Sequence, residues 1–273
     1  MFERTHRRSS FAASLSIIGL IHLNTVRQIR KNHGNPLLGL MLNMMKTITM
    51  VLIFYFMFSI LGLKSSAIRG DFLLYIMSGI FLFLTHNNAM SSVIGSEGPT
   101  AAMMKHAPMN TIVSISSAAL SSLYLQLLTM VLILFIYHVA FSPVVIDDPV
   151  GAFAMVLLAW LSGVAVGLLF LALNPWAPTL TGVFSTIYAR ANMITSGKMF
   201  VANQLPANLL VLFSWNPLFH TIDQARGFAF VNYTPHNSSA MYPVYVSAAL
   251  IMVGLLGEFY TRQHASLSWQ AGK

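Results

Sequence analysis

The sequence predicts an all-α integral membrane protein with six transmembrane helices, an N-terminal amphipathic interface helix and outer re-entrant helices before the last span. Of its 273 residues, 56% are hydrophobic and only 8% are charged, whereas a soluble domain carries about 25% charged residues. Six apolar stretches also approach the roughly 20 residues that a helix needs to cross a bilayer. This composition excludes a soluble globular protein and a disordered one, and the absence of cysteine excludes a disulfide scaffold and thiol catalysis.

Residues 1–36 are predicted to form a cytoplasmic tail followed by the interface helix. Apolar side chains recur there at steps of three or four residues, or multiples of them, at Phe11, Leu15, Ile18, Val26 and Ile29. Three cations follow on the polar side, namely Arg27, Arg30 and Lys31. A helix of this kind lies in the membrane interface with its cations toward anionic lipid. Gly34 and Pro36 then end it.

Residues 37–261 are predicted to form the six-span domain, and 262–273 a second cytoplasmic tail. The expected spans are 37–63, 72–94, 111–141, 150–173, 179–201 and 243–260. The fifth is the least hydrophobic of these and contains Arg190 and Lys198. A cation at membrane depth is costly, so Arg190 either lines a pathway or pairs locally at the end of a shorter span.

The region 203–242 is predicted to dip into the membrane from the outer side as short re-entrant helices. It is too apolar around 209–213 for a free loop, and its prolines break any long helix. Non-helical backbone at membrane depth must lie against protein or a wet cavity. We therefore expect Trp215 near a turn, with Arg226 returning toward the outer surface.

Both termini are predicted to be cytoplasmic, because Lys and Arg concentrate in the N-terminal segment, the break at 96–110 and the C-terminal tail. The formal charge of +8 lies mainly beside the first apolar run, which fits membrane topology better than binding of nucleic acid. The chain is therefore expected to cross a membrane several times.

No catalytic residue and no metal ligand is predicted. The nine histidines are scattered without an HExxH motif, and the neighbouring side chains of Asp147 and Asp148 diverge instead of bracketing one bond. His86, followed by two asparagines, favours a polar cluster between helices over a proton relay. The GxxxG formed by Gly163 and Gly167 allows close approach of helices. No P-loop motif is present, so any ATP would be bound and hydrolysed by another polypeptide.

Two stretches of the chain carry distinctive motifs. The first runs from His22 to Gly39 as HLNTVRQIRKNHGNPLLG, a basic helix followed by L-G. The second comprises SG at 196–197, LP at 205–206 and WNPLFHTIDQAR at 215–226. Together these motifs resemble those of polysaccharide-exporting ABC-2 permeases. Gln28 and Asp223 stand where the family usually has Glu, and the Trp and Glu-Pro often found early in its first span are absent.

The resemblance implies a homodimer in a bacterial inner (plasma) membrane. The homodimer would work with two ABC ATPase subunits, which would bind ATP and Mg. The break at 96–110 would then be the loop that docks on the ATPase, through Glu97, Met103, Met104, Lys105, His106 and Pro108. Residues 27–31 would act as an interface or gate helix. Further expected partners are a glycan substrate and periplasmic and outer-membrane polysaccharide export proteins.

The translocation path is expected to use aromatic faces for sliding contact with sugars, together with one cation. The candidate residues are Tyr188, Arg190, Phe200, Phe213, Trp215 and Phe219. An interfacial aromatic belt is the alternative for any single ring. Capsular polysaccharide is the favoured cargo, and O-antigen, teichoic acid or a small lipophilic solute are the alternatives. A membrane enzyme would need a nucleophile–base or metal pair facing one cavity, and a scaffold would not need the 215–226 series.

Overall fold

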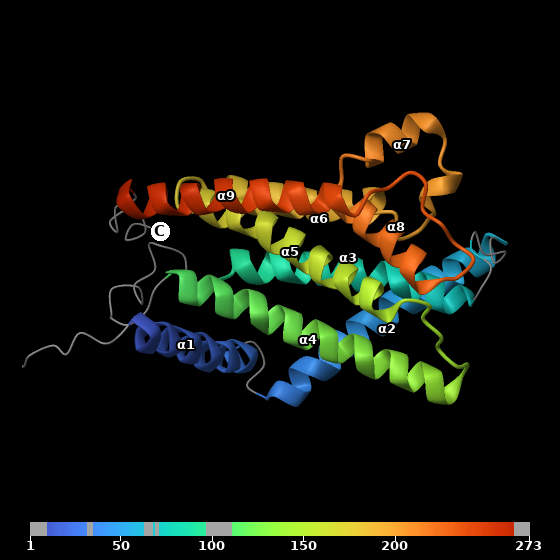
Figure 1. Ribbon diagram of the computed structural model, residues 1–273, viewed down its shortest axis with the longest axis horizontal. Helices are drawn as coiled ribbons and strands as arrows, with labels where there is room; N and C mark the ends of the chain where they lie inside the picture. Colours follow the sequence, from blue (N-terminus) through green and yellow to red (C-terminus); the bar gives the residue numbers. More distant parts are fainter. Residues whose placement is uncertain (1–9, 32–34, 63–67, 69–70, 97–110, 265–273) are drawn as a thin grey trace, which may run out of the picture.

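The computed structural model describes residues 10–31, 35–62, 68, 71–96 and 111–264, and these ranges contain helices and no strand. The helices lie in an elongated bundle (Figure 1). In chain order they are α1 Ser10–Lys31, α2 Pro36–Ile60, α3 Phe72–Ile94, α4 Thr111–Ala140, α5 Pro149–Leu173, α6 Pro178–Thr195, α7 Ala207–Phe213, α8 Pro217–Ala229 and α9 Met241–His264. A short 3₁₀ helix, Ala202–Gln204, precedes α7. The prediction of an all-α membrane protein is confirmed.

Five of the described helices, α2, α3, α4, α5 and α9, are long and apolar enough to cross a membrane. The fifth predicted span, α6, is shorter than expected, at 18 residues. It ends at Thr195 because Gly197 has a φ of 76°, a left-handed conformation that ends helices and that glycine adopts without steric cost. The predicted extension of this span to residue 201 is therefore wrong, and Lys198 lies beyond the helix.

Helix starts follow a simple local rule in which Asn or Asp caps the helix and Pro often comes next. Asn35, Asp148 and Asn216 each accept a backbone N–H of the first turn with the side chain, and a proline follows each of them. Asp71 caps α3 in the same way without a proline. Such caps satisfy donors that the helix itself leaves unpaired. Asp148 is thus a cap at the start of α5 and not only a solvated turn residue.

The core of the bundle is formed by α3 and α5, which have the largest buried shares among the long apolar helices. A Cβ added to Gly163 would lie 2.2 Å from the carbonyl oxygen of His86, and one added to Gly167 would lie 2.9 Å from that of Met90. These glycines let the two backbones touch, so the GxxxG motif packs helices within one chain.

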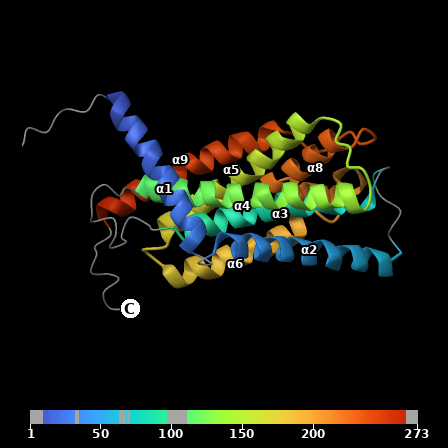
Figure 2. The ribbon, with the colours of Figure 1, turned by 90° about the horizontal axis from the view of Figure 1, so that it is seen from below.

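The two ends of the bundle differ. At one end, called here the α1 end, α1 crosses α4 obliquely (Figure 2), and the C-terminal end of α9 lies at the same end of the bundle. Ser117 of α4 donates to the carbonyl of Ile21 over 3.1 Å, while Ile18, Leu23 and Val26 remain exposed. Helix α1 therefore leaves apolar side chains uncovered by the rest of the described chain, and its placement in the membrane interface stays a prediction.

At the opposite end, called the α8 end, α7 and α8 lie between α6 and α9 in the chain, within the region predicted to hold re-entrant helices. Both are too short to cross a bilayer. Helix α8 is buried from Pro217 to Asp223 and packs on α3 and α5. Helix α8 thus lies against protein. A segment that enters the membrane without crossing it needs such cover.

Candidate translocation surface

Helix α6 packs on the rest of the chain along one narrow face only. Thr181 and Asn192 are buried on that face, and Tyr188 is half-buried beside them. A wide apolar face is uncovered and carries Leu180, Val183, Phe184, Ile187 and Ile194. Between the two faces lies a stripe with Gly182, Thr186 and Arg190 spaced four residues apart, and Arg190 is exposed. An apolar groove of about 640 Å³ runs along α6 against the end of α5.

Helix α2 is likewise uncovered over most of its length. Figure 2 shows α2 and α6 bordering the same side of the bundle, with α9 on the opposite side. We call this side the α2/α6 face. Its exposed apolar residues on α2 include Met41, Met45, Leu52 and Phe56. A face of this kind requires lipid or another protein chain to cover it.

A buried polar chain ties α6 to the core. The Oη of Tyr188 lies 3.1 Å from Nε2 of His86 in α3, and Nδ1 of His86 lies 2.9 Å from Oγ of Ser162 in α5. His86 and Ser162 are both buried. The prediction of a polar cluster between helices is confirmed, and its partner Ser162 was not predicted because nothing in the sequence around it marks it.

These hydrogen bonds do not match the arrangement of an activated serine. Ser162 donates its own proton to the carbonyl of Ala159 over 2.8 Å, so its oxygen accepts from Nδ1–H of His86. Nε2 of His86 then accepts the proton of Tyr188. A nucleophilic serine would need the reverse arrangement, with histidine accepting the hydroxyl proton.

Three of the predicted path aromatics pack against one another. Phe200 and Phe213 stack with their ring centroids 5.4 Å apart, and Phe219 joins them in a small hydrophobic cluster that joins α7 to α8. Trp215 is 78% exposed, and its carbonyl accepts from Oη of Tyr242 over 3.0 Å. In this arrangement Arg190 and Trp215 are exposed, Tyr188 and Phe200 are partly buried, and Phe213 and Phe219 are buried.

Arg226 does not return to the outer surface, contrary to expectation, because it is 0% exposed. Its Nη1 donates to the carbonyls of Gly197 and Phe200, and its Nη2 to that of Lys198, over 2.7–2.8 Å. The guanidinium also lies 4.3 Å from the ring centroid of Tyr75. Arg226 therefore holds the turn that ends α6, and its charge is dispersed over three carbonyl dipoles and a ring face.

The rest of the 215–226 series serves the same junction. The amide nitrogen of Asn216 donates to Asn192 and Thr195 of α6 over 2.7 and 2.8 Å, while its oxygen caps α8. Nδ1 of His220 accepts from the N–H of Ser239, so its Nε2–H donates to the carbonyl of Ser214. The series thus joins α6, α7, α8 and the loop before α9, and it specifies folding directly.

The remaining predicted residues lie toward the α1 end. Arg27 and Arg30 are exposed on α1, and Lys31 is its last residue. Arg30 lines a cleft of about 580 Å³ between α1 and α4. The predicted ATPase-docking residues, Glu97, Met103, Met104, Lys105, His106 and Pro108, lie outside the described residues. Their flanking helices α3 and α4 end and begin at the α1 end of the bundle (Figure 1).

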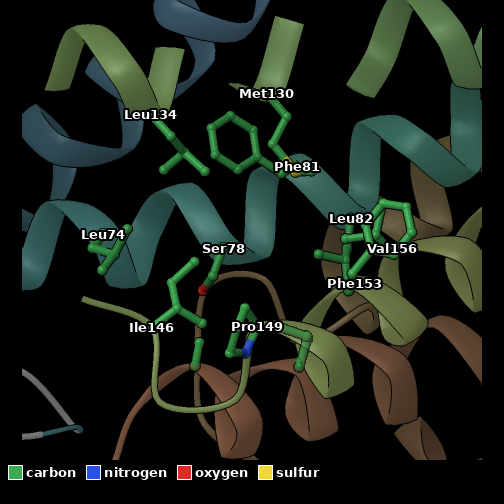
Figure 3. A pocket seen from close by; sticks show the side chains of 13 residues that line it. Leu74, Ser78, Phe81, Leu82, Met130, Leu134, Ile146, Pro149, Phe153 and Val156 are labelled. Atoms are coloured by element: carbon green, nitrogen blue, oxygen red, sulfur yellow. The ribbon is translucent and has the colours of Figure 1, made fainter. Parts of the chain in front are cut away.

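An apolar cavity of about 180 Å³ lies between α3, α4, α5 and α8 (Figure 3). Leu74, Phe81, Leu134 and Phe153 are among its lining residues, and no titratable side chain is among them. Its one hydroxyl, that of Ser78, donates to the carbonyl of Tyr75 over 2.8 Å. This cavity therefore offers no nucleophile–base pair, and the described part of the chain contains no cluster of acidic, cysteine or histidine residues able to hold a metal ion.

The family model described as ABC-2 type transporter matches residues 19–230 of the chain. The matched region runs from the second half of α1 to the residue after α8. No match was found among the curated proteins.

Proposed function

The chain belongs to the ABC-2 type transporter family, and from this premise we propose that it is the permease of an ATP-driven exporter of polysaccharide. As a family member it is a multi-pass transmembrane subunit of an ABC transporter, and the family implies an ABC ATPase partner. Two copies would form the conduit, with two ATPase subunits docked at 96–110. Capsular polysaccharide is the proposed cargo, and the proposed location is a bacterial inner membrane with both termini in the cytoplasm.

The single observation that best supports a conduit is the uncovered α2/α6 face. Helix α6 presents a polar stripe next to an apolar face and is held to its own chain mainly by Tyr188 and Asn192. A second copy placed on the apolar faces would cover them and leave the stripe with Arg190 facing a gap. A cation at membrane depth is stable in such a wet gap.

A glycan fits this surface for a chemical reason. Sugars carry hydroxyl groups that need hydrogen-bond partners and apolar CH faces that rest on aromatic rings. Thr186 and Arg190 supply the first kind of contact on α6, and Trp215 supplies the second at the α8 end. The 215–226 series, which resembles polysaccharide exporters, also supports this choice of cargo over a small lipophilic solute.

ATP binding by the partner would move the docked loops and tilt α3 and α4, which flank 97–110. Helix α6 would move together with α3, because the hydrogen bond between Tyr188 and His86 joins these two helices. The α7–α8 unit would form the exit, since Arg226 joins its motion to the end of α6. These are rigid-body movements of packed helices.

Measurement of ATPase activity in the purified complex of permease and ATPase tests the proposal. We expect a candidate capsular polysaccharide to change the hydrolysis rate, while a small lipophilic solute leaves it unchanged. A response to the solute alone would identify a different cargo. If no complex with an ATPase forms, the transport proposal itself is wrong.

A further inference from the structure

A polar cleft of about 290 Å³ lies between α2, α3 and α4. Its polar lining residues are Asn43, Lys46, Asn88, Ser91, Ser92 and Ser122. All of these belong to helices long and apolar enough to cross a membrane. A polar recess in such helices is costly unless something in it satisfies the polar groups.

The side-chain amide N–H groups of the two asparagines in the polar cleft donate to other side chains of the protein. Asn88 donates to Gln126 over 3.0 Å, and Asn43 donates to Thr129 over 2.8 Å. The ammonium of Lys46 donates to the side-chain oxygen of Asn88 over 3.1 Å. The amide network therefore orients Asn88 so that its oxygen faces Lys46.

Lys46 remains a cation without an anion in the described part of the chain. An ammonium carries three N–H donors, and one of them is used by Asn88. No carboxylate of the described residues pairs with it. Lys46 is exposed, and a neutral amide oxygen does not balance its charge, so the ammonium is available to an anionic ligand from outside the chain.

The position of Lys46 on α2 determines how deep in the membrane such a ligand would lie. Lys46 lies about 15 Å along the helix from Pro36, the first residue of α2. A lysine on a helix directs its side chain toward the helix N-terminus and extends its ammonium toward the membrane interface. The ammonium is thus within reach of the headgroup region at the α1 end.

An apolar groove adjoins the cleft. This groove is the space of about 580 Å³ between α1 and α4 described above. It shares Ile29 with the polar cleft, and Leu120, Leu123 and Leu127 are among its lining residues. Arg30 lines the same groove. A cationic, hydroxyl-bearing recess beside a hydrocarbon-lined groove has the chemistry of a site for a molecule with an anionic head and an apolar tail.

We propose that this site binds the phosphate headgroup of an anionic phospholipid from the leaflet at the α1 end. The phosphate oxygens accept from Lys46 and from the hydroxyls of Ser91 and Ser92, and an acyl chain lies in the groove between α1 and α4. The bound lipid would hold α1, α2 and α4 together at the point where the interface helix meets the first span. This inference goes beyond the proposed function and does not depend on which cargo is exported.

The test is lipid binding by the purified full chain in nanodiscs of phosphatidylcholine with or without phosphatidylglycerol, measured by native mass spectrometry. We expect phosphatidylglycerol to bind the wild type and Lys46→Gln to weaken this binding roughly tenfold or more, because a charge-assisted hydrogen bond is lost. Lys46→Arg should retain most of the affinity. Ser91→Trp should reduce it by filling the cleft, and Arg262→Gln on the exposed end of α9 should not change it.

Unfolding midpoints in phosphatidylcholine alone check the fold, since glutamine can still bond to Asn88. If K46Q binds phosphatidylglycerol as tightly as the wild type, the proposal is overturned. It is also overturned if the wild type binds a lipid-linked glycan and no phosphatidylglycerol, because the site would then serve the cargo. Failure of the chain to export any glycan would leave the expected lipid binding intact, so the two proposals fail separately.

Discussion

Single polar residues decide how the last third of this chain folds. Arg226 is fully buried and its three hydrogen bonds end on carbonyls of the turn after α6. Gly79 of α3 makes room for this contact, because a Cβ there would lie 2.8 Å from Nη2 of Arg226. The residues that most resemble polysaccharide exporters thus include one that holds the junction between α6 and α8.

Replacement of Arg226 by Gln should destabilise the protein by about 3 kcal/mol or more, since three buried carbonyls lose their donors. The exposed Arg262→Gln variant on α9 is the matched control and should stay within about 0.5 kcal/mol of the wild type. Both can be measured as urea unfolding in a mild detergent. Equal stability of the two variants would contradict the role assigned to Arg226.

Asp71 gives a pH-dependent prediction. Burial alone would raise the pKa of its carboxyl, but hydrogen bonds from Tyr137, Ser142 and the N–H groups of Leu73 and Leu74 outweigh this and lower the pKa. A lowered pKa stabilises the fold above the ordinary value of about 4, and this contribution is lost as the pH falls through the folded-state pKa.

Asp71→Asn should therefore cost about 1 kcal/mol at pH 7, because asparagine can still cap α3 but the charged acceptor for the hydroxyls of Tyr137 and Ser142 is lost. The difference in unfolding free energy between the variant and the wild type should disappear as the solution is acidified below about pH 4, because the protonated carboxyl then resembles the amide. Thermal unfolding as a function of pH measures both. A gap that is constant with pH would show that the charge contributes nothing.

At the scale of helices, much of the fold could be predicted from the sequence. The span 72–94 agrees with α3 at both ends, and the apolar patches in 203–242 agree with α7 and α8. These elements are fixed by local signals, namely apolar length, caps and proline. The end of α6 was missed because it depends on the φ of Gly197 and on Arg226, which lies 29 residues later and meets it only in the folded chain.

The candidate site was less predictable than the helices. Tyr188 and Arg190 were named from their residue types, but the pairing of Tyr188 with His86 joins positions 102 residues apart. The burial of Phe213 and Phe219 likewise follows from the way α7 folds back on α8. Sequence pattern indicates which residue types are available, and only the packing decides which of them remain uncovered.

The close contact between α3 and α5 can be tested with two Gly→Ala variants. Their expected effects on the free energy of unfolding differ. Gly163→Ala should destabilise the protein by several kcal/mol, because its Cβ would lie 2.2 Å from a backbone oxygen that cannot move alone. Gly19→Ala on α1 has no atom within 4 Å of its Cβ and should be neutral or stabilising by up to about 1 kcal/mol. Comparable losses in both variants would argue against the close packing.

The tether of α6 is tested by Tyr188→Phe. Removal of the hydroxyl leaves Nε2 of the buried His86 without its donor and should cost about 1–3 kcal/mol. Hydrogen exchange in α6 should rise more than in α5. Tyr245→Phe, an exposed position on α9, is the control and should change neither quantity. Unchanged exchange in α6 would mean that other contacts hold it.

At the scale of the whole molecule, the account requires a second copy on the α2/α6 face. The chain has no cysteine, so one introduced residue reports one contact. Ile187→Cys on α6 should form a disulfide-linked dimer in native membranes, whereas Met252→Cys on the opposite side should not. Both side chains are exposed in the single chain. Dimers through Met252 and none through Ile187 would place the interface elsewhere.

The central claim is that two copies of this chain conduct a polysaccharide under the control of a partner ATPase. The most direct measurement is uptake of the polysaccharide into inverted membrane vesicles that contain both subunits. We expect uptake that requires ATP and both proteins, and that is lost on charge reversal at Glu97 while ATP hydrolysis continues. Uptake without the ATPase, uptake that survives this reversal, or transport of a lipophilic solute in place of the glycan would contradict the account.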